Sequence, residues 1–220
     1  MSIANRRDAS PHTASSAAGP SAPIRARREF PIRSVPGGRL TPVLWELGAG
    51  TRLRLGRPKG LFGLDPDERR SHLVVATGTG LAPAMSMPGS LRASVGPATS
   101  TAWRAVVVHG TSSASELAYR DRLEHWAGTD PRVAYVPVAS RPGLPANAGW
   151  KGATGRVDGL VGAICEQHGL DAAGTVACVC GNPDAIDSVT RALMARGFPP
   201  GAIVTEQCWA ASGPQPARSA

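Results

Sequence analysis

The sequence predicts an α/β fold, in which a partial antiparallel β-barrel precedes a doubly wound parallel sheet. An apolar, β-branched run at residues 73–77 has the composition of a buried strand and ends at Gly78-Thr79-Gly80. A second buried strand, residues 176–180, ends at Gly181-Asn182-Pro183. From residue 72 onward such strands alternate with helical patterns, and this alternation is typical of a parallel sheet.

The two glycine turns predict a ligand site. A turn with small side chains at the end of a buried strand lets the backbone approach a flat or phosphorylated ligand closely. The helix that follows such a turn offers its first N–H groups to an anion. One Gly-x-Gly turn is weak support for nucleotide binding, but two in one sheet suggest a single ligand held between them.

The remaining elements of this part follow from periodicity and helix-capping signals. Strands are expected at 73–77, 104–109, 133–138, 175–180 and near 202–205. Ser113 and Glu116 form a capping-box pattern, which predicts a helix with Tyr119, Leu123 and Trp126 on one face. Asn182 is expected to cap a helix that begins at Pro183 and ends before Gly197. His109 ends a strand and is expected to be a packed or capping residue rather than a catalytic base.

The chain before residue 69 has a different character. Residues 1–28 are rich in Ala, Ser, Pro and Arg and are expected to be a low-complexity tail. Residues 29–35 and 52–55 alternate like half-buried strands, with a short helix at 40–47 between them for which Thr41 is the expected N-cap. Together they suggest half of a small antiparallel barrel. The predicted domains are therefore a tail at 1–28, a partial barrel at 29–68 and an α/β domain at 69–220.

Composition excludes several classes of protein. No apolar stretch approaches the roughly 18 residues of a membrane helix, and no signal-peptide core is present, so a cytoplasmic protein without a membrane span is expected. The four cysteines include no CxxC pair and have no nearby zinc-type His spacing, so no metal site is predicted. The net charge of +8 favours an acidic partner. Few aromatic residues lie among the basic ones, so nucleic acid is not expected.

A set of motifs in order along the chain resembles the bacterial type of ferredoxin–NADP reductase, within the superfamily of flavoprotein pyridine nucleotide reductases. The motifs, which span residues 29 to 209, are Val35–Thr41, Pro58–Phe62, Gly78–Pro83, His109-Gly110, Ser140-Arg141, Gly155-Arg156, Cys180–Pro183 and Glu206-x-x-Trp209. The resemblance implies an FAD-binding barrel followed by an NADP-binding sheet. It also implies electron transfer between NADP(H) and ferredoxin or flavodoxin, an acidic carrier.

The resemblance assigns roles to residues of the NADP half. The pyrophosphate would lie along the turn formed by Gly78, Thr79 and Gly80. The nicotinamide would be bordered by Cys180, Gly181, Asn182 and Pro183. Arg141 and Arg156 would grip the adenosine 2′-phosphate, because a guanidinium fork suits phosphate oxygens. Ordinary readings stay open beside these. Each arginine could be a solvated loop charge, and Cys180 a small core thiol.

The flavin half is assigned in the same way, with departures from the family pattern. His12 and Thr13 would lie against the flavin, Gly38, Leu40 and Thr41 would bind its pyrophosphate, and Trp209 would supply an aromatic ring. Thr13, Cys180 and Glu206 are the implied catalytic residues, although Glu206 could equally be a solvated carboxylate. Ser10 and His12 replace the arginine and tyrosine of the family, and the barrel strands that the family pattern places before residue 10 are expected to be absent. FAD is therefore expected to be held weakly.

Three functions remain open from the sequence. The first is an NADPH-dependent flavoprotein reductase that works as a monomer. The second is an NADP-binding remnant without FAD. The third is a reductase subunit whose barrel is completed by a partner chain.

Overall fold

The computed structural model describes residues 29–56, 62, 71–83, 85–87 and 104–207. The chain divides into two compact units, Met1–Lys59 and Gly60–Ala220. Each unit is described by itself. The predicted tail at 1–28 lies outside the described residues.

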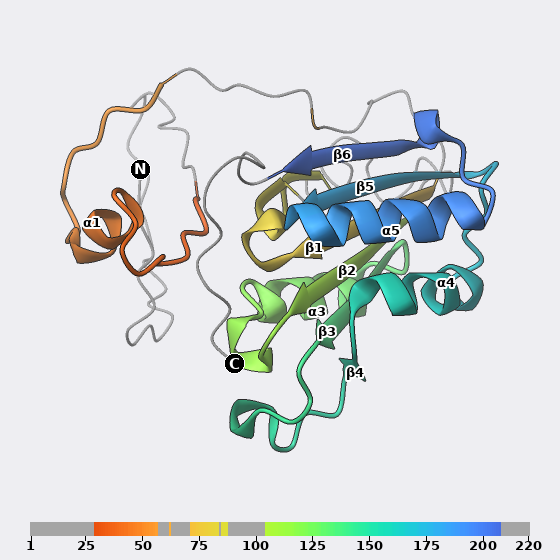
Figure 1. Ribbon diagram of the computed structural model, residues 1–220, viewed down its shortest axis with the longest axis horizontal. Coiled ribbons are helices and arrows are strands. Elements are labelled where there is room, and N and C mark those ends of the chain that lie inside the picture. Colours follow the sequence, from red (N-terminus) through yellow and green to blue (C-terminus); the bar gives the residue numbers. More distant parts are fainter. Residues whose placement is uncertain (1–28, 57–61, 63–70, 84, 88–103, 208–220) are drawn as a thin grey trace, which may run out of the picture. The chain divides into compact units, whose positions relative to one another are not determined.

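The second unit is built on a six-stranded sheet in the order β4-β3-β2-β1-β5-β6 (Figure 1). Its strands are β1 (Ser71–Thr77), β2 (Ala105–Thr111), β3 (Val133–Ala139), β4 (Ala153–Thr154), β5 (Thr175–Gly181) and β6 (Ile203–Gln207). Every neighbouring pair is parallel, which confirms the predicted α/β fold class. The chain winds outward from β1 in one direction and from β5 in the other, so the switch point of the topology lies between these two strands.

Helices cover both faces of this sheet. Helices α4 (Val157–Gln167) and α5 (Pro183–Ala195) pack on one face, and α3 (Arg120–Thr129) packs on the other (Figure 1). Residues 81–83 and 85–87 are helical as well. The described connections include four single 3₁₀ turns: Gly78–Gly80, Ala114–Glu116, Pro145–Asn147 and Pro200–Ala202.

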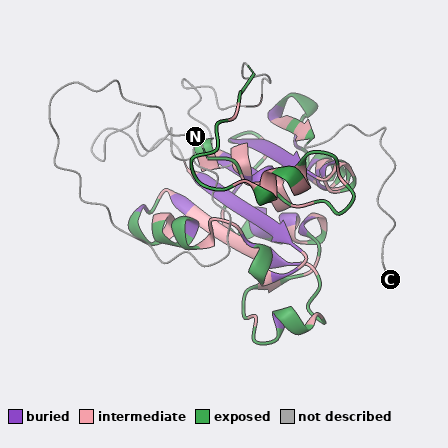
Figure 2. Cartoon of the chain, turned by 90° about the vertical axis from the view of Figure 1, so that its left-hand side faces the viewer, coloured by how far each residue is buried: buried purple, intermediate pink, exposed green. Residues whose placement is uncertain are grey.

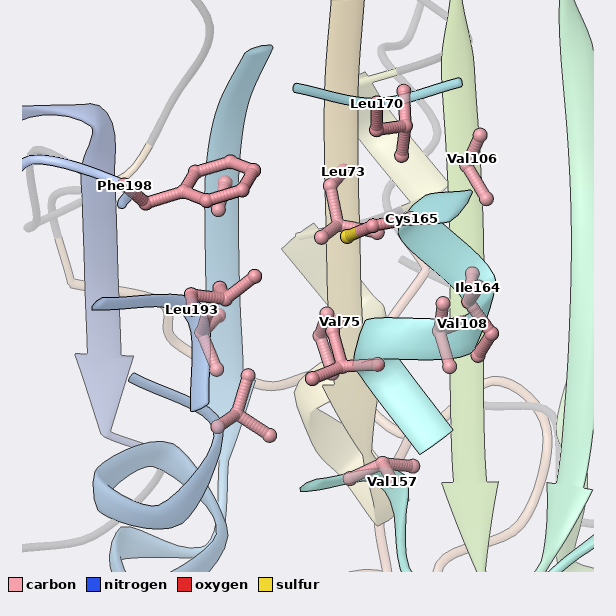
Figure 3. Close-up of a cluster of buried hydrophobic side chains, with 14 of the residues drawn as sticks. Leu73, Val75, Val106, Val108, Val157, Ile164, Cys165, Leu170, Leu193 and Phe198 are labelled. Atoms are coloured by element: carbon pink, nitrogen blue, oxygen red, sulfur yellow. The ribbon is translucent and has the colours of Figure 1, made fainter. Parts of the chain in front are cut away.

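The core has two layers, one on each side of β1. Leu73 and Val75 point into the layer beneath α4 and α5 (Figure 3). Val74 and Ala76 point into the opposite layer, with Leu123 of α3. The central strands are buried along their length (Figure 2). Burial on both faces explains why β1 is a continuous apolar run rather than an alternating one.

The predicted strands of this unit are confirmed, and one helix start is corrected. The Ser113–Glu116 capping box forms, but it caps the 3₁₀ turn at 114–116. Helix α3 begins only at Arg120, after Tyr119 takes the left-handed conformation with φ 57°. This left-handed residue interrupts the helical path between the capping box and α3. Of the residues predicted to share a face of this helix, Leu123 and Trp126 lie in α3, with Leu123 buried, whereas Tyr119 packs beside the same cluster from the position before the helix.

The described part of the first unit, residues 29–56, contains one short helix, α1 (Thr41–Glu46), and no strand. The strands expected at 29–35 and 52–55 are therefore wrong as secondary structure. A strand needs a partner to accept its backbone hydrogen bonds, and neither segment pairs with one. The N-cap is also corrected, since Leu40 occupies that position and Thr41 Oγ1 instead accepts a hydrogen bond from Val35 N at 3.0 Å. The partial barrel at 29–68 stays a prediction.

Within the described residues, no helix is both long and apolar enough to cross a bilayer.

Candidate functional site

The two glycine turns meet at the carboxyl ends of β1 and β5. These strands are neighbours, and Ala76 of β1 pairs with Cys180 of β5. The turns that follow are in close contact: a Cβ atom on Gly80 would lie 2.5 Å from the Cys180 carbonyl oxygen and 2.7 Å from Gly181 Cα. Gly181 has φ +139°, and a side chain there would collide with Thr77. Both positions therefore require glycine, which lets the two turns lie in direct contact.

Thr77 ties the two turns together. Its Oγ1 atom accepts a hydrogen bond from Asn182 N at 3.0 Å. The Asn182 side chain in turn accepts from Asp184 N at 2.8 Å and so caps α5, as the sequence predicts. Helix α5 is 13 residues long and has Pro183 in its first turn. Its amino end, with its partial positive charge, therefore starts at the switch point of the sheet.

His109 ends up as a packed residue beside the first turn, which agrees with expectation. Its side chain is fully buried on β2, with Nδ1 3.4 Å from the Tyr135 hydroxyl. Burial lowers the pKa of His109 to about 4, and the backbone of Gly78 opposes that shift only in part. The imidazole is neutral near pH 7, so it supports the turn without adding charge.

The two predicted arginines follow the ends of neighbouring strands at equivalent places. Ala139 of β3 pairs with Thr154 of β4, and Arg141 and Arg156 each follow two residues after that pair. Arg156 Nε lies 3.1 Å from Asp158 Oδ1, and 63% of its side chain is exposed. Arg141 is exposed as well. The Asp158 carboxylate therefore competes with an external anion for the Arg156 guanidinium.

All these residues share the carboxyl edge of the sheet. Cys180 pairs with Glu206 of β6, so the predicted nicotinamide side lies over β5 and β6. Cys180 is buried, and Glu206 is half-buried. From β5 to β4 there are four strand spacings, or about 19 Å. The candidate site is thus elongated, with the two glycine turns in the middle and arginines at one end.

The predicted flavin residues are only partly within the described structure. Gly38, Leu40 and Thr41 belong to the first unit, and His12, Thr13 and Trp209 lie outside the described residues. A Cβ on Gly38 would lie 2.9 Å from the Val35 carbonyl, so this turn also needs glycine. Leu40 is 64% exposed, and the Thr41 hydroxyl is engaged by Val35. Gly38 and Leu40 thus lie in the turn that leads into α1, and Thr41 is the first residue of that helix.

Sequence reasoning missed two residues of this edge. Thr77 was available to it, because a hydroxyl directly before a glycine turn is well placed to hold a neighbouring backbone. Asn147 was not, since it lies in an irregular loop between β3 and β4 where no periodicity applies. The structure buries Asn147 among three backbone groups. Within the described residues there is no cluster of three or more side chains suited to a metal ion.

Comparison with known proteins agrees with this geometry. The family described as oxidoreductase NAD-binding domain matches residues 74–191. The reductase component 1 of terephthalate 1,2-dioxygenase from Comamonas sp is 30% identical over 169 residues, which cover 76% of this chain and 46% of that protein. Ferredoxin–NADP reductase B of Sorangium cellulosum (strain So ce56) is 35% identical over 136 residues, covering 61% of this chain and 52% of that protein.

A solved structure extends the similarity to the fold. The cytochrome P450 reductase GcoB of Amycolatopsis has a TM-score of 0.66 at 28% identity, over 80% of this chain and 50% of its own. The chain thus spans about half the length of each of these three proteins.

Proposed function

The chain belongs to the oxidoreductase NAD-binding domain family, the family of the ferredoxin reductases, and on this basis we propose that it is an NADPH-dependent reductase. In this proposal it passes electrons from NADPH through FAD to ferredoxin or flavodoxin. The observation that carries the proposal is the pair of glycine turns in contact at the switch point between β1 and β5. Open α/β sheets bind ligands at such a point.

The elongated edge suits a dinucleotide in one orientation. The pyrophosphate would lie on the Gly78–Gly80 turn, where backbone approaches without obstruction by side chains. The nicotinamide would lie by Cys180 and Glu206, and the adenosine end would lie toward Arg141. NADPH rather than NADH is proposed because an arginine fork suits the three oxygens of a 2′-phosphate.

The proposed role of the protein is to position cofactors rather than to attack the substrate. When bound, nicotinamide and flavin supply the hydride and electron chemistry. Gly80 and Gly181 let the two turns lie against each other, and the Thr77 hydroxyl bonds one turn to the other. Thr13, Cys180 and Glu206 are the proposed residues at the reacting rings, with Glu206 exchanging a proton with solvent.

The proposal also assigns residues to FAD binding and to the attraction of the electron carrier. Gly38, Leu40 and Thr41 would hold the flavin pyrophosphate, together with His12, Thr13 and Trp209 at the flavin itself. Because the family arginine is replaced by Ser10, we propose that FAD is held weakly. The exposed Arg52 and Arg54 of the first unit would attract an acidic carrier.

Absorption spectroscopy combined with nucleotide binding tests the proposal. The protein is purified with added FAD, and its visible spectrum is recorded before and after gel filtration, while calorimetry measures NADPH and NADH binding. The expected result is flavin absorption that declines on gel filtration and tighter binding of NADPH than of NADH. A colourless protein that binds NADPH would favour the remnant without FAD. No binding of either nucleotide would contradict the proposal entirely.

A further inference from the structure

We propose that Asn147 is a positioning residue for nucleotide selectivity: its buried amide holds the backbone of Arg141 so that the guanidinium meets the adenosine 2′-phosphate. This inference rests on the proposed function, because it assigns that phosphate to the Arg141 end of the site. It adds a residue that touches no ligand and acts through another side chain.

The Asn147 amide joins the loops that follow β2 and β3. Its Nδ2 atom donates to the Ser112 carbonyl at 3.0 Å and to the Arg141 carbonyl at 2.7 Å. Its Oδ1 atom accepts from Ala114 N at 2.8 Å. Both amide protons and one oxygen lone pair are therefore used. Only 5% of Asn147 is exposed, so water cannot readily replace these bonds.

Hydrogen bonds restrain the backbone on both sides of Arg141. Just before it, Ser140 N donates to the Thr111 carbonyl at 2.8 Å and continues the β2–β3 ladder. Just after it, the Arg141 carbonyl accepts from Asn147 Nδ2 and from Leu144 N, the latter at 3.1 Å. An exposed arginine side chain on a fixed backbone loses less conformational freedom on binding than one on a loose loop. Asn147 thus supplies preorganisation.

Arg156 provides a contrast within the same site. Its backbone follows β4, and its guanidinium is held by Asp158 at 3.1 Å. The hydrogen bonds of the Asn147 side-chain amide go instead to Ser112, Ala114 and Arg141. Loss of the Asn147 side chain should therefore act on the part of the selectivity that depends on Arg141.

A double-mutant cycle on the full chain tests this proposal. Calorimetry measures 2′-phospho-AMP and 5′-AMP binding to the unmodified protein, Asn147→Ala, Arg141→Ala and the double variant. The ratio of the two affinities isolates the 2′-phosphate and is insensitive to a general loss of stability. We expect Asn147→Ala to lower the ratio about tenfold, the order of the cost of immobilising one long side chain on binding, and to have no further effect when Arg141 is already alanine.

Ser113→Ala is the matched control. It removes the Ser113 Oγ acceptor for Ser115 N at 3.3 Å, in the same loop as Ala114, without touching the Arg141 carbonyl. We expect its affinity ratio to equal that of the unmodified protein. If Asn147→Ala does not fold, exchange of the Asn147 side-chain amide protons in the unmodified protein is measured instead. Slow exchange supports the proposal, and exchange at the rate of a solvated amide overturns it.

The possible failures are distinguishable. If Arg141→Ala lowers the ratio and Asn147→Ala leaves it unchanged, the role of Asn147 is wrong and the phosphate site stands. If Asn147→Ala lowers the ratio equally in both backgrounds, it does not act through Arg141, and the proposal is overturned. If the unmodified protein shows no preference for 2′-phospho-AMP, both this inference and the proposed NADPH specificity fail.

Discussion

Two glycines at the site are dictated by close approach of backbone to backbone. Gly80 lies against the carbonyl of Cys180, and Gly181 lies against Thr77, so each makes room for the other turn. The sequence suggests that these glycines let the backbone approach a ligand closely. The structure adds that the turns also need glycine in order to lie next to each other.

Substitution of Gly80 tests this reason directly. Gly80→Ala places a methyl group 2.5 Å from a backbone oxygen, so one of the turns must shift. We expect a destabilisation of about 1 to 3 kcal/mol, measured by urea unfolding, together with weaker nucleotide binding.

Gly159→Ala is the control for Gly80→Ala. Gly159 lies in α4 with no atom within 4 Å of its would-be Cβ, so alanine should stabilise the helix by about 0.5 to 1 kcal/mol. Equal behaviour of the two variants would show that the close contact of the turns is unimportant.

His109 gives the protein a defined pH dependence. Its folded-state pKa of about 4 lies below the ordinary value of 6.5, so the folded state favours the neutral ring. The resulting stability is complete above about pH 6.5 and is lost as the pH falls toward 4, because the unfolded chain takes up the proton first. The window of loss is therefore pH 6.5 to 4.

His109→Gln removes this titration. Over that window the unmodified protein should lose about 3 kcal/mol more unfolding free energy than the variant. The pKa of His168 is also lowered by burial, but His168 is present in both proteins and cancels in the comparison. Urea unfolding at several pH values measures the difference, and parallel curves for the two proteins would contradict the account.

At the scale of elements, a single hydroxyl joins β1, β5 and the start of α5. Thr77 Oγ1 holds Asn182 N, and Asn182 caps α5, so the strand ends and the helix start are set together. Thr77 follows the buried run of β1, and its side chain is placed by the same parallel register that pairs Ala76 with Cys180.

Thr77→Val keeps the shape of the side chain and removes the acceptor. It leaves the part-buried Asn182 N–H without that partner, so we expect a loss of about 1 to 2 kcal/mol in unfolding free energy. Thr77→Ser keeps the hydroxyl and serves as the control, with a smaller expected loss. If valine were no more destabilising than serine, the hydroxyl link would have no energetic role.

Element starts show where sequence patterns stop being sufficient. Asn182 was predicted as a cap and is one, because its signal, an Asn followed by Pro at the helix start, is entirely local. The Ser113 box is equally real but serves a 3₁₀ turn, because the left-handed Tyr119 separates that turn from α3. A capping motif predicts that a helical turn begins at that residue. Whether the turn continues into a longer helix depends on the tertiary structure around it.

At the scale of the whole molecule, the predictability of the two units differs. The parallel sheet could be predicted because its strands are buried on both faces and each ends in a recognisable turn. Residues 29–35 and 52–55 have the alternating apolar and polar pattern of a half-buried strand, but neither segment forms one. The pattern shows that one face could be buried, whereas a strand also needs a neighbouring strand to pair with. Asn147 could not be found, because its contacts join residues 33 and 35 positions apart.

The central claim is that one nucleotide binds along the carboxyl edge of the sheet, across the turns of β1 and β5. A titration of the isotope-labelled full chain with NADP+, followed by the backbone amide signals in NMR spectra, tests it most directly. The account predicts that Gly78, Gly80, Gly181 and Arg141 shift together with one affinity, while Leu170 and Thr175, before and at the amino end of β5, stay in place. Shifts confined to the amino edge, or no shift at the two glycine turns at saturating NADP+, would contradict it.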